Sequence, residues 1–246
     1  MTRKRPNVLV TGVGRHVSIG TGIARQLAID GWDVAFASYR PDAGFAQDFA
    51  AELEGLGARA VSIEADMADP ASPESILRQA RQSLGLIRGL VSSHALCVNS
   101  SIQDTSLESF DSHFAINTRA NWLLIKAFAD LYSDRHGDGR IVVLTSDHTT
   151  HNLPYGASKG ALDRIVIAAA TELSHLGITA NLINPGPIDT GWMTADLAET
   201  VRSETAAGRL GTPQDTAHLA SFLLSTNGAW INGQLLHSNG GFHLQS

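Results

Sequence analysis

Residues 11–24 decide the fold of this chain, and they read Thr-Gly-Val-Gly-Arg-His-Val-Ser-Ile-Gly-Thr-Gly-Ile-Ala. An apolar run from Asn7 to Thr11 precedes this stretch, and apolar residues at helical spacing follow it at Ile23, Leu27 and Ala28. The order predicts a strand, a tight turn and a helix. Glycines let such a turn approach a phosphate, and the helix N-terminus offers free N–H groups. The stretch therefore predicts a dinucleotide site, although a glycine-rich turn alone also fits a plain strand-to-helix connection.

The rest of the chain continues this alternation of short apolar runs and longer helical patterns, which is typical of βα units around a parallel sheet. We predict one α/β domain over residues 1–246. It is a single Rossmann fold, a doubly wound sheet of seven parallel strands in the order 3-2-1-4-5-6-7 with helices on both faces. A substrate loop is expected at about residues 186–212, where the alternation lapses. The expected strands are Asn7 to Thr11, Asp33 to Ser38, Arg59 to Ala65, Arg88 to Ser93, Arg140 to Ser146, Ile178 to Asn184 and Gly233 to Ser238.

Composition and charge exclude several classes of function. The 246 residues include 18 Lys and Arg against 24 Asp and Glu, a formal net charge of −6 that does not attract nucleic acid or anionic lipid. No apolar run is long enough to span a bilayer, and the first residues lack the apolar core of a signal peptide. The single cysteine, Cys97, cannot form an internal disulfide. We therefore expect a cytoplasmic protein that binds neither membranes nor nucleic acid.

The choice of dinucleotide depends on the end of the second predicted strand, where an acid binds the adenosine ribose and a cation accepts a 2′-phosphate. Arg40 lies there and, with Arg15 of the glycine turn, provides two guanidinium groups suited to a phosphate. The alternative ribose ligand, Asp42, follows Pro41 at a predicted helix N-cap. The pattern favours NADP(H) over NAD(H).

Tyr155 and Lys159 are four residues apart at the start of a predicted helix, so they share one face. An ammonium near a phenol favours the phenolate, and we expect Lys159 to lower the pKa of Tyr155 toward neutrality. Alone, such a pair is usually part of a solvated helix face. Together with the glycine turn it predicts a site of proton transfer.

Six pieces of the sequence, in order, resemble the short-chain dehydrogenase/reductase family, and in particular its 3-oxoacyl-acyl carrier protein reductases. They are the turn at Thr11 and Gly12, Asp66 after the third strand, Asn117, Ser146, Tyr155 with Lys159, and residues 185–190. The resemblance implies an NADPH-dependent reduction of a ketone to a secondary alcohol, with a 3-oxoacyl thioester, a polyketide-like ketone, a small cyclic ketone or a sugar as candidate substrates. Two predicted helical regions, 107–136 and 155–176, correspond to the family's main dimer contact, so a homotetramer or homodimer is expected.

The resemblance also implies roles for individual residues. Tyr155 is the expected general acid/base, Ser146 positions the substrate carbonyl, Lys159 binds the nicotinamide ribose and tunes Tyr155, and Asn117 holds a proton-relay water. Asp66 is expected at the adenine, and Ile188 and Thr190 at the nicotinamide and phosphate. The full set of expected cofactor-binding residues is Gly12, Gly14, Arg15, Ser18, Ile19, Gly20, Arg40, Asp66, Met67, Ser93, Lys159, Pro185, Gly186, Ile188 and Thr190.

The chain departs from the family pattern at three places. Its glycine turn is two residues longer than usual, with Ser18 in place of the middle glycine, and resembles that of enoyl-acyl carrier protein reductases. Those enzymes separate the tyrosine and lysine by seven residues, so we expect reduction of C=O and keep C=C reduction as an alternative. The fourth strand ends in Ser-Ser-His-Ala at residues 92–95, where the family commonly has Asn-Asn-Ala-Gly; His94 is expected to pack, with a cofactor or substrate contact as the alternative.

The third departure is the distance of nine residues from Ser146 to Tyr155, which is shorter than in typical members. It makes His148 and His151 candidate substrate contacts on a short loop. Trp192 and Met193 are candidates for an apolar substrate wall, with lid packing as the equal alternative. No carboxylate or thiolate stands at ligand spacing from these histidines, so no metal is expected. An NADPH-binding sensor without turnover is the alternative from another class of function.

Overall fold

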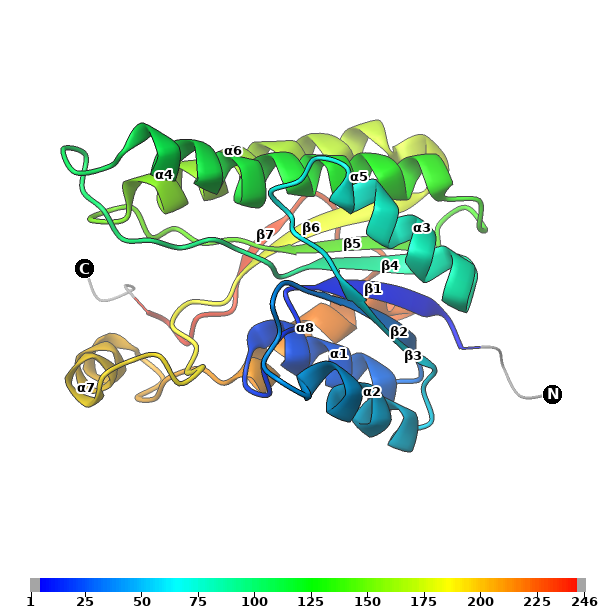
Figure 1. Cartoon of the computed structure of the whole chain (residues 1–246), viewed down its shortest axis with the longest axis horizontal. Coiled ribbons are helices and arrows are strands. Elements are labelled where there is room, and N and C mark those ends of the chain that lie inside the picture. Colours follow the sequence, from blue (N-terminus) through cyan, green and yellow to red (C-terminus); the bar gives the residue numbers. More distant parts are fainter. Residues whose placement is uncertain (1–4, 243–246) are drawn as a thin grey trace.

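The computed structural model describes residues 5–242, which form a seven-stranded parallel sheet in the order β3-β2-β1-β4-β5-β6-β7 (Figure 1). The predicted Rossmann fold and strand order are confirmed. The strands are β1 (Asn7–Thr11), β2 (Asp33–Ser38), β3 (Ala60–Glu64), β4 (Ile87–Ser92), β5 (Gly139–Leu144), β6 (Ile178–Asn184) and β7 (Leu235–His237).

Two strand ends differ from the prediction in ways that shape the site. β5 ends at Leu144, two residues before the predicted end, so Ser146 lies in the loop beyond the sheet. β7 is only three residues long and, as an edge strand, pairs with β6 alone, through Leu182, Ile183 and Asn184. The early end of β5 places Ser146 beyond the carboxyl edge of the sheet, where Rossmann folds bind ligands.

Helices cover both faces of the sheet (Figure 1). One layer holds α1 (Ile19–Ile29), α2 (Phe45–Gly55) and α8 (Pro213–Leu224). The other holds α3 (Ser72–Leu84), α4 (Leu107–His113), the π-helical turn η1 (Phe114–Arg119), α5 (Ala120–Leu131) and α6 (Leu153–Glu172). The remaining elements are α7 (Ala195–Glu204), which stands apart from the sheet, and the 3₁₀ turns η2 (Ser174–Leu176) and η3 (Thr226–Gly228). Within residues 5–242, no helix is both long and apolar enough to cross a membrane.

Each layer has its own hydrophobic core, because successive side chains of a strand point to opposite faces. In β1, Leu9 packs with Leu124 of α5, whereas Val8 and Val10 pack in the cluster that contains Ile23 of α1. Strands buried on both faces are apolar at successive positions, which explains the unbroken runs in the sequence. The two cores hold the helices that carry the site residues in place.

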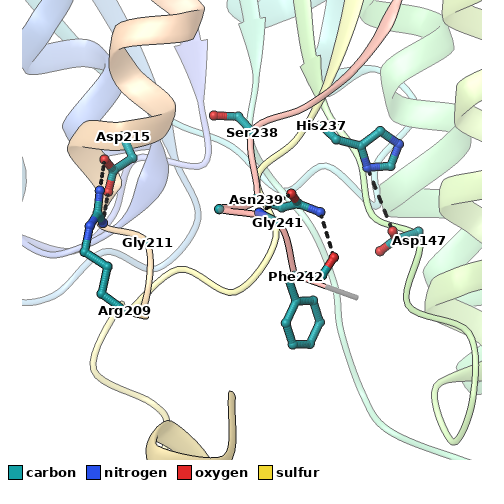
Figure 2. A pocket seen from close by; sticks show the side chains of 10 residues that line it. Asp147, Arg209, Gly211, Asp215, His237, Ser238, Asn239, Gly241 and Phe242 are labelled. Carbon is teal, nitrogen blue, oxygen red and sulfur yellow. Dashed lines mark hydrogen bonds and ion pairs between the residues drawn. The ribbon is translucent and has the colours of Figure 1, made fainter. Parts of the chain in front are cut away.

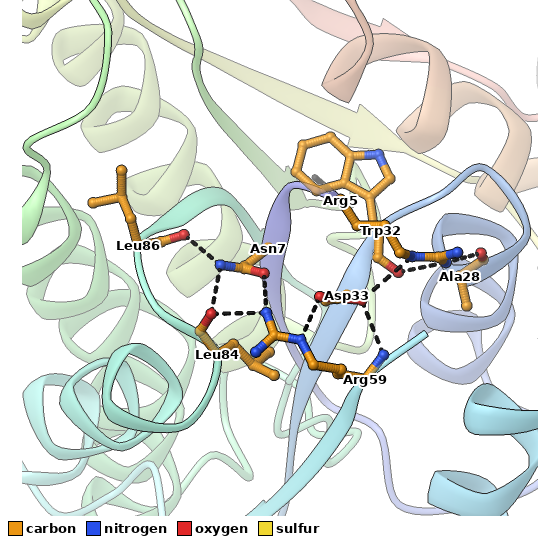
Figure 3. A network of polar contacts seen from close by, with 8 residues as sticks. All are labelled: Arg5, Asn7, Ala28, Trp32, Asp33, Arg59, Leu84 and Leu86. Atoms are coloured by element: carbon orange, nitrogen blue, oxygen red, sulfur yellow. Dashed lines mark hydrogen bonds and ion pairs between the residues drawn. The ribbon is translucent and has the colours of Figure 1, made fainter. Parts of the chain in front are cut away.

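A polar network ties the amino ends of the strands together (Figure 3). Asp33, the first residue of β2, accepts hydrogen bonds from Nε of Arg59 at 2.7 Å and from its backbone N–H at 2.9 Å, and Arg5 pairs with it at 3.3 Å. Asn7, the first residue of β1, donates to the carbonyl of Leu84 at the end of α3 at 3.0 Å. Because it lies at the amino ends, this network stabilises the fold without reaching the carboxyl edge.

Candidate active site

The glycine turn closes on backbone so tightly that side chains are excluded at two positions. A Cβ on Gly12, whose φ is +75°, would lie 2.6 Å from the backbone nitrogen of His94, and one on Gly20 would lie 2.5 Å from the carbonyl oxygen of Gly12. Ser18 caps α1 by accepting from the N–H of Thr21 at 3.1 Å, and the first turn of the helix carries no acid. A tight backbone cradle before a helix N-terminus without acids fits a pyrophosphate. Gly14, Arg15 and Ile19 lie in the same segment.

The end of β2 comes next to this turn. Asp42 donates its backbone N–H to the carbonyl of Gly14 at 3.0 Å, which brings the two loops together. The predicted N-cap role of Asp42 is wrong, because α2 begins at Phe45 and Gly44, with φ +78°, is its N-cap. Arg40 is exposed and has a φ of +46°, with its guanidinium 5.0 Å from the Tyr39 ring centroid.

Ser38, Asp66 and Met67 lie at or just after the ends of β2 and β3, where the adenosine of a dinucleotide is expected. The hydroxyl of Ser38 is buried and, within residues 5–242, makes no hydrogen bond, so a polar ligand at the end of β2 would satisfy it. Asp66 is exposed after β3 and accepts from the N–H of Ala68 at 2.8 Å. Met67 is 7% exposed and packs in the core, and its role in cofactor binding stays a prediction.

The first turns of α6 and the loop after β5 bring the three central side chains together. Tyr155 is half-buried, and a hydrogen bond joins its hydroxyl to that of Ser146, which lies beyond the end of β5. Lys159 is buried one turn further on, and its Nζ lies 5.7 Å from the centroid of the Tyr155 ring. The same Nζ donates to the carbonyl of Leu144 at 2.8 Å. The structure therefore gathers the predicted serine, tyrosine and lysine at the carboxyl end of the sheet.

The pKa of Tyr155 differs from the expectation. Burial raises the pKa of Tyr155 to about 12, a nearby Cys97 adds to the rise, and the hydrogen bond from Ser146 opposes it. The expectation that Lys159 lowers the pKa of Tyr155 is wrong, because burial has the larger effect and the ammonium donates to the carbonyl of Leu144. Burial also lowers the pKa of Lys159 to about 8, against the attraction of Asp163. At neutral pH Tyr155 is therefore a protonated phenol, which can donate its proton.

Asn117 lies fully buried in the π-helical turn η1, beside α6. Its Oδ1 accepts from the N–H of Leu96 at 2.7 Å, and its Nδ2 donates to the carbonyl of Leu96 at 2.8 Å and to Oγ of Ser158 at 2.9 Å. Ser158 in turn donates to the carbonyl of Tyr155 at 2.7 Å. Because both amide hydrogens are used, Asn117 fixes the loop after β4 against the start of α6.

His94 is placed inside the fold. It is 8% exposed, with Nδ1 2.7 Å from the hydroxyl of Thr11 and Nε2 3.1 Å from the carbonyl of Ile116. Because both ring nitrogens are already bonded, the geometry favours packing over a hydrogen bond from His94 to a substrate. Burial and the charge of Lys159 lower the pKa of His94 to about 3, so the ring is neutral. The expectation that His94 packs agrees with this geometry.

The other candidate substrate residues are exposed or half-buried. His148 and His151 are exposed on the loop before α6, and Nδ1 of His148 is 3.3 Å from Nδ2 of Asn152. Trp192 is 63% exposed, and Met193 is half-buried. Within the described residues 5–242, no group of His, Cys, Asp or Glu is arranged to hold a metal.

The loop after β6 runs along the same edge. Pro185 and Ile188 are buried, and Ile188 forms a bridge with Gly211. Gly186 has a φ of +64°, and a Cβ there would lie 2.4 Å from Cβ of Asn239, so this position requires glycine. Thr190 is half-buried, as is Ser93, whose N–H donates to Thr11 at 3.3 Å. The predicted substrate loop contains α7, whose residues are mostly exposed.

A cavity of about 640 Å³ opens at the carboxyl end of β7 (Figure 2). It borders the candidate site through Asp147, which directly follows Ser146, and Asp147 lies 4.0 Å from Nδ1 of His237. Ser146, Tyr155 and Lys159 do not line it. The lining residues are Asp147, Arg209, Gly211, Asp215, His237, Ser238, Asn239, Gly240, Gly241 and Phe242.

Sequence reasoning missed several members of the site. Asn121 donates to the carbonyl of Asn117 at 2.8 Å, and its spacing of four residues on a predicted helix was the available signal. The only signal in the sequence for Ser38 was its position at the end of a predicted strand. Cys97 was considered for disulfides alone, yet it lies close enough to Tyr155 and Lys159 to raise the pKa of both side chains.

The sheet order, the glycine cradle and the serine–tyrosine–lysine group define a Rossmann-fold oxidoreductase. The family model described as enoyl-(acyl carrier protein) reductase matches residues 12–243. The chain belongs to the short-chain dehydrogenase/reductase family.

Relatives of known name or structure cover almost the whole chain. The uncharacterized oxidoreductase YjdA of Bacillus subtilis is 34% identical over 95% of both chains. An NADPH-dependent aldehyde reductase-like chloroplastic protein of Arabidopsis thaliana is 34% identical over 95% of this chain and 93% of its own. A short-chain dehydrogenase from Burkholderia cenocepacia, solved in complex with NADP, is 33% identical with a TM-score of 0.88 and covers 97% of this chain and 98% of its own.

Proposed function

We propose that this chain is an NADPH-dependent carbonyl reductase that converts a ketone or aldehyde to an alcohol. The observation that carries the proposal is the placement of Tyr155 beside Ser146 and one helical turn before Lys159, whose Nζ lies 5.7 Å from the centroid of the Tyr155 ring. A carbonyl oxygen beside Tyr155 and Ser146 would accept hydrogen bonds from both hydroxyls as negative charge develops on it. Tyr155 would then transfer its proton to that oxygen.

The residues present fit the dinucleotide. The cradle at Gly12 and Gly20 would take the pyrophosphate, and Lys159 would hold the nicotinamide ribose. When bound, NADPH supplies the hydride that reduces the carbonyl carbon. The preference for NADP(H) over NAD(H) is supported by exposed Arg15 and Arg40, and by relatives named as NADPH-dependent or solved with NADP.

The substrate is proposed as a small carbonyl compound. A 3-oxoacyl thioester or a polyketide-like ketone follows from the resemblance, and the plant relatives named as aldehyde reductases add aldehydes. The enoyl reductase alternative is favoured by the description of the matching family model and by the long glycine turn. The four-residue spacing of Tyr155 and Lys159 favours C=O reduction.

We also propose a cytoplasmic homotetramer or homodimer. Trp122 of α5 is 50% exposed and Ile167 of α6 is 37% exposed, and apolar side chains there suit a contact between copies. The free thiol of Cys97 is consistent with a reducing compartment. Light scattering of the purified chain measures the oligomeric state.

The test is the loss of NADPH absorbance with a panel of aldehydes, ketones, 3-oxoacyl thioesters and enoyl thioesters. Carbonyl-dependent oxidation of NADPH is the expected result. Oxidation with enoyl thioesters alone would establish the C=C alternative. Tight NADPH binding without turnover of any compound would identify a sensor.

A further inference from the structure

The helix that carries Asn117 changes its hydrogen-bonding register at η1. The N–H of Ala120 donates to the carbonyl of Ala115, five residues back, where an α-helix would bond four back. A π-helical turn is wider than an α-helix, and turns of this kind often occur at functional sites. The shifted register needs support from outside the helix, because buried carbonyls must find donors.

Two side chains donate to consecutive carbonyls of this turn. Nε2 of His94 lies 3.1 Å from the carbonyl oxygen of Ile116, so that nitrogen must carry the hydrogen. Nδ2 of Asn121 donates to the carbonyl of Asn117 at 2.8 Å. The 3.4 Å separation of these two nitrogens follows from their donation to neighbouring carbonyls. His94 and Asn121 together stabilise the π register.

The other edge of the His94 ring faces the glycine turn. With hydrogen on Nε2, Nδ1 is an acceptor, and the hydroxyl of Thr11 donates to it at 2.7 Å. Thr11 ends β1 and leads directly into the glycine turn. A protonated ring could not accept this bond, and the low pKa of about 3 keeps His94 neutral. The imidazole therefore bridges the glycine turn and η1.

We propose that His94 is a positioning residue, whose neutral ring holds η1 in the π register and thereby sets the place of Asn117. The proposal rests on the proposed function, to which the role of Asn117 belongs. Asn117 donates to Ser158, which bonds the carbonyl of Tyr155, so a shift of Asn117 reaches the turn that carries Tyr155 and Lys159. The requirement on residue 94 is one donor and one acceptor at opposite ends of a buried side chain.

Two substitutions separate this requirement from simple filling of space. Glutamine in His94→Gln can donate to Ile116 and accept from Thr11, whereas leucine in His94→Leu can do neither. We expect His94→Leu to lower kcat about 10- to 100-fold, the range for displaced catalytic groups, while the Kd for NADPH changes less than about threefold. His94→Gln should keep kcat within about threefold of wild type. Equal kcat losses in both variants, or none in His94→Leu, would overturn the proposal.

The matched control is Leu124→Ala, which removes a fully buried side chain of α5 outside this network. Leu124→Ala should lower the unfolding temperature and leave kcat unchanged. A loss of kcat as large as that of His94→Leu would mean that general destabilisation of the fold, and not the position of Asn117, lowers kcat. Amide hydrogen exchange over residues 114–121 needs no turnover, and faster exchange in His94→Leu but not in His94→Gln is expected. Unchanged exchange in His94→Leu would contradict the proposal, whereas a wild type inactive on every carbonyl would contradict only the proposed function.

Discussion

Nζ of Lys159 donates a hydrogen bond to the carbonyl oxygen of Leu144 at 2.8 Å. Leu144 is the last residue of β5, so this bond joins the second turn of α6 to the strand that leads into Ser146. Tyr155 lies one turn earlier on the same helix and shares a hydrogen bond with Ser146. The buried ammonium thus fixes the relative positions of the proposed acid and its neighbour.

The pH dependence of the reaction should follow Lys159. Its pKa is lowered to about 8 by burial, whereas burial raises the pKa of Tyr155 to about 12. As pH rises through about 8 the lysine loses its charge while the tyrosine stays protonated. We expect kcat/KM for carbonyl reduction to be constant near neutrality and to fall above about pH 8.

A pH profile of initial rates checks this expectation, with thermal unfolding at each pH as the control for stability. A rate that stays constant until the titration of Tyr155 would show that the charge of Lys159 is not needed. A fall that begins below neutrality would point to a different group.

Arg40→Ala tests the proposed preference for NADPH. Removal of a charge-assisted contact to a phosphate costs about 1.5–3 kcal/mol, so the Kd for NADPH should rise about 10- to 100-fold. The Kd for NADH, which lacks the 2′-phosphate, should not change. The matched control is Arg78→Ala, an exposed arginine of α3 paired with Glu74. Equal losses for both dinucleotides would remove Arg40 from the discrimination.

Stability should depend on the network at the amino ends of the strands (Figure 3). Asp33→Ala deletes the acceptor of Arg59 and the partner of Arg5, and we expect a loss of about 2 kcal/mol in the free energy of unfolding. Glu74→Ala, which removes an exposed ion pair, should cost less than about 0.5 kcal/mol. Denaturant unfolding measures both values. A kcat below wild type in folded Asp33→Ala would contradict the separation of this network from the site.

The sequence predicted much of the fold because strand periodicity and glycine turns are local signals. β1, β2 and β6 have the predicted bounds. The π turn η1 was not predictable. The spacing of apolar residues over 107–136 fits an α-helix equally well whether or not one backbone N–H bonds five residues back in place of four. The misplaced N-cap at Asp42 has a similar cause, because Pro41 and Asp42 resemble a helix start and the left-handed conformation of Gly44 shows only in three dimensions.

The candidate site was predicted in its residue types more than in its electrostatics. Ser146, Tyr155 and Lys159 are brought together as expected, because a four-residue helical spacing fixes a shared face. The predicted direction of the shift in the Tyr155 pKa was wrong, because the burial of this side chain depends on the whole fold. The sequence also does not show that the ammonium of Lys159 bonds to the carbonyl of Leu144. The role proposed for His94 was equally hard to predict, since Thr11 and Ile116, which its ring joins, are distant from it in sequence.

Proton donation by Tyr155 is tested by single-turnover oxidation of NADPH by Tyr155→Phe with a carbonyl substrate of the wild type. We expect a rate at least about 100-fold below wild type, with the Kd for NADPH nearly unchanged. Tyr132→Phe, which removes a hydroxyl bonded to the carbonyl of Arg135, is the matched control and should react at the wild-type rate. A wild-type rate in Tyr155→Phe would show that the phenol does not supply the proton.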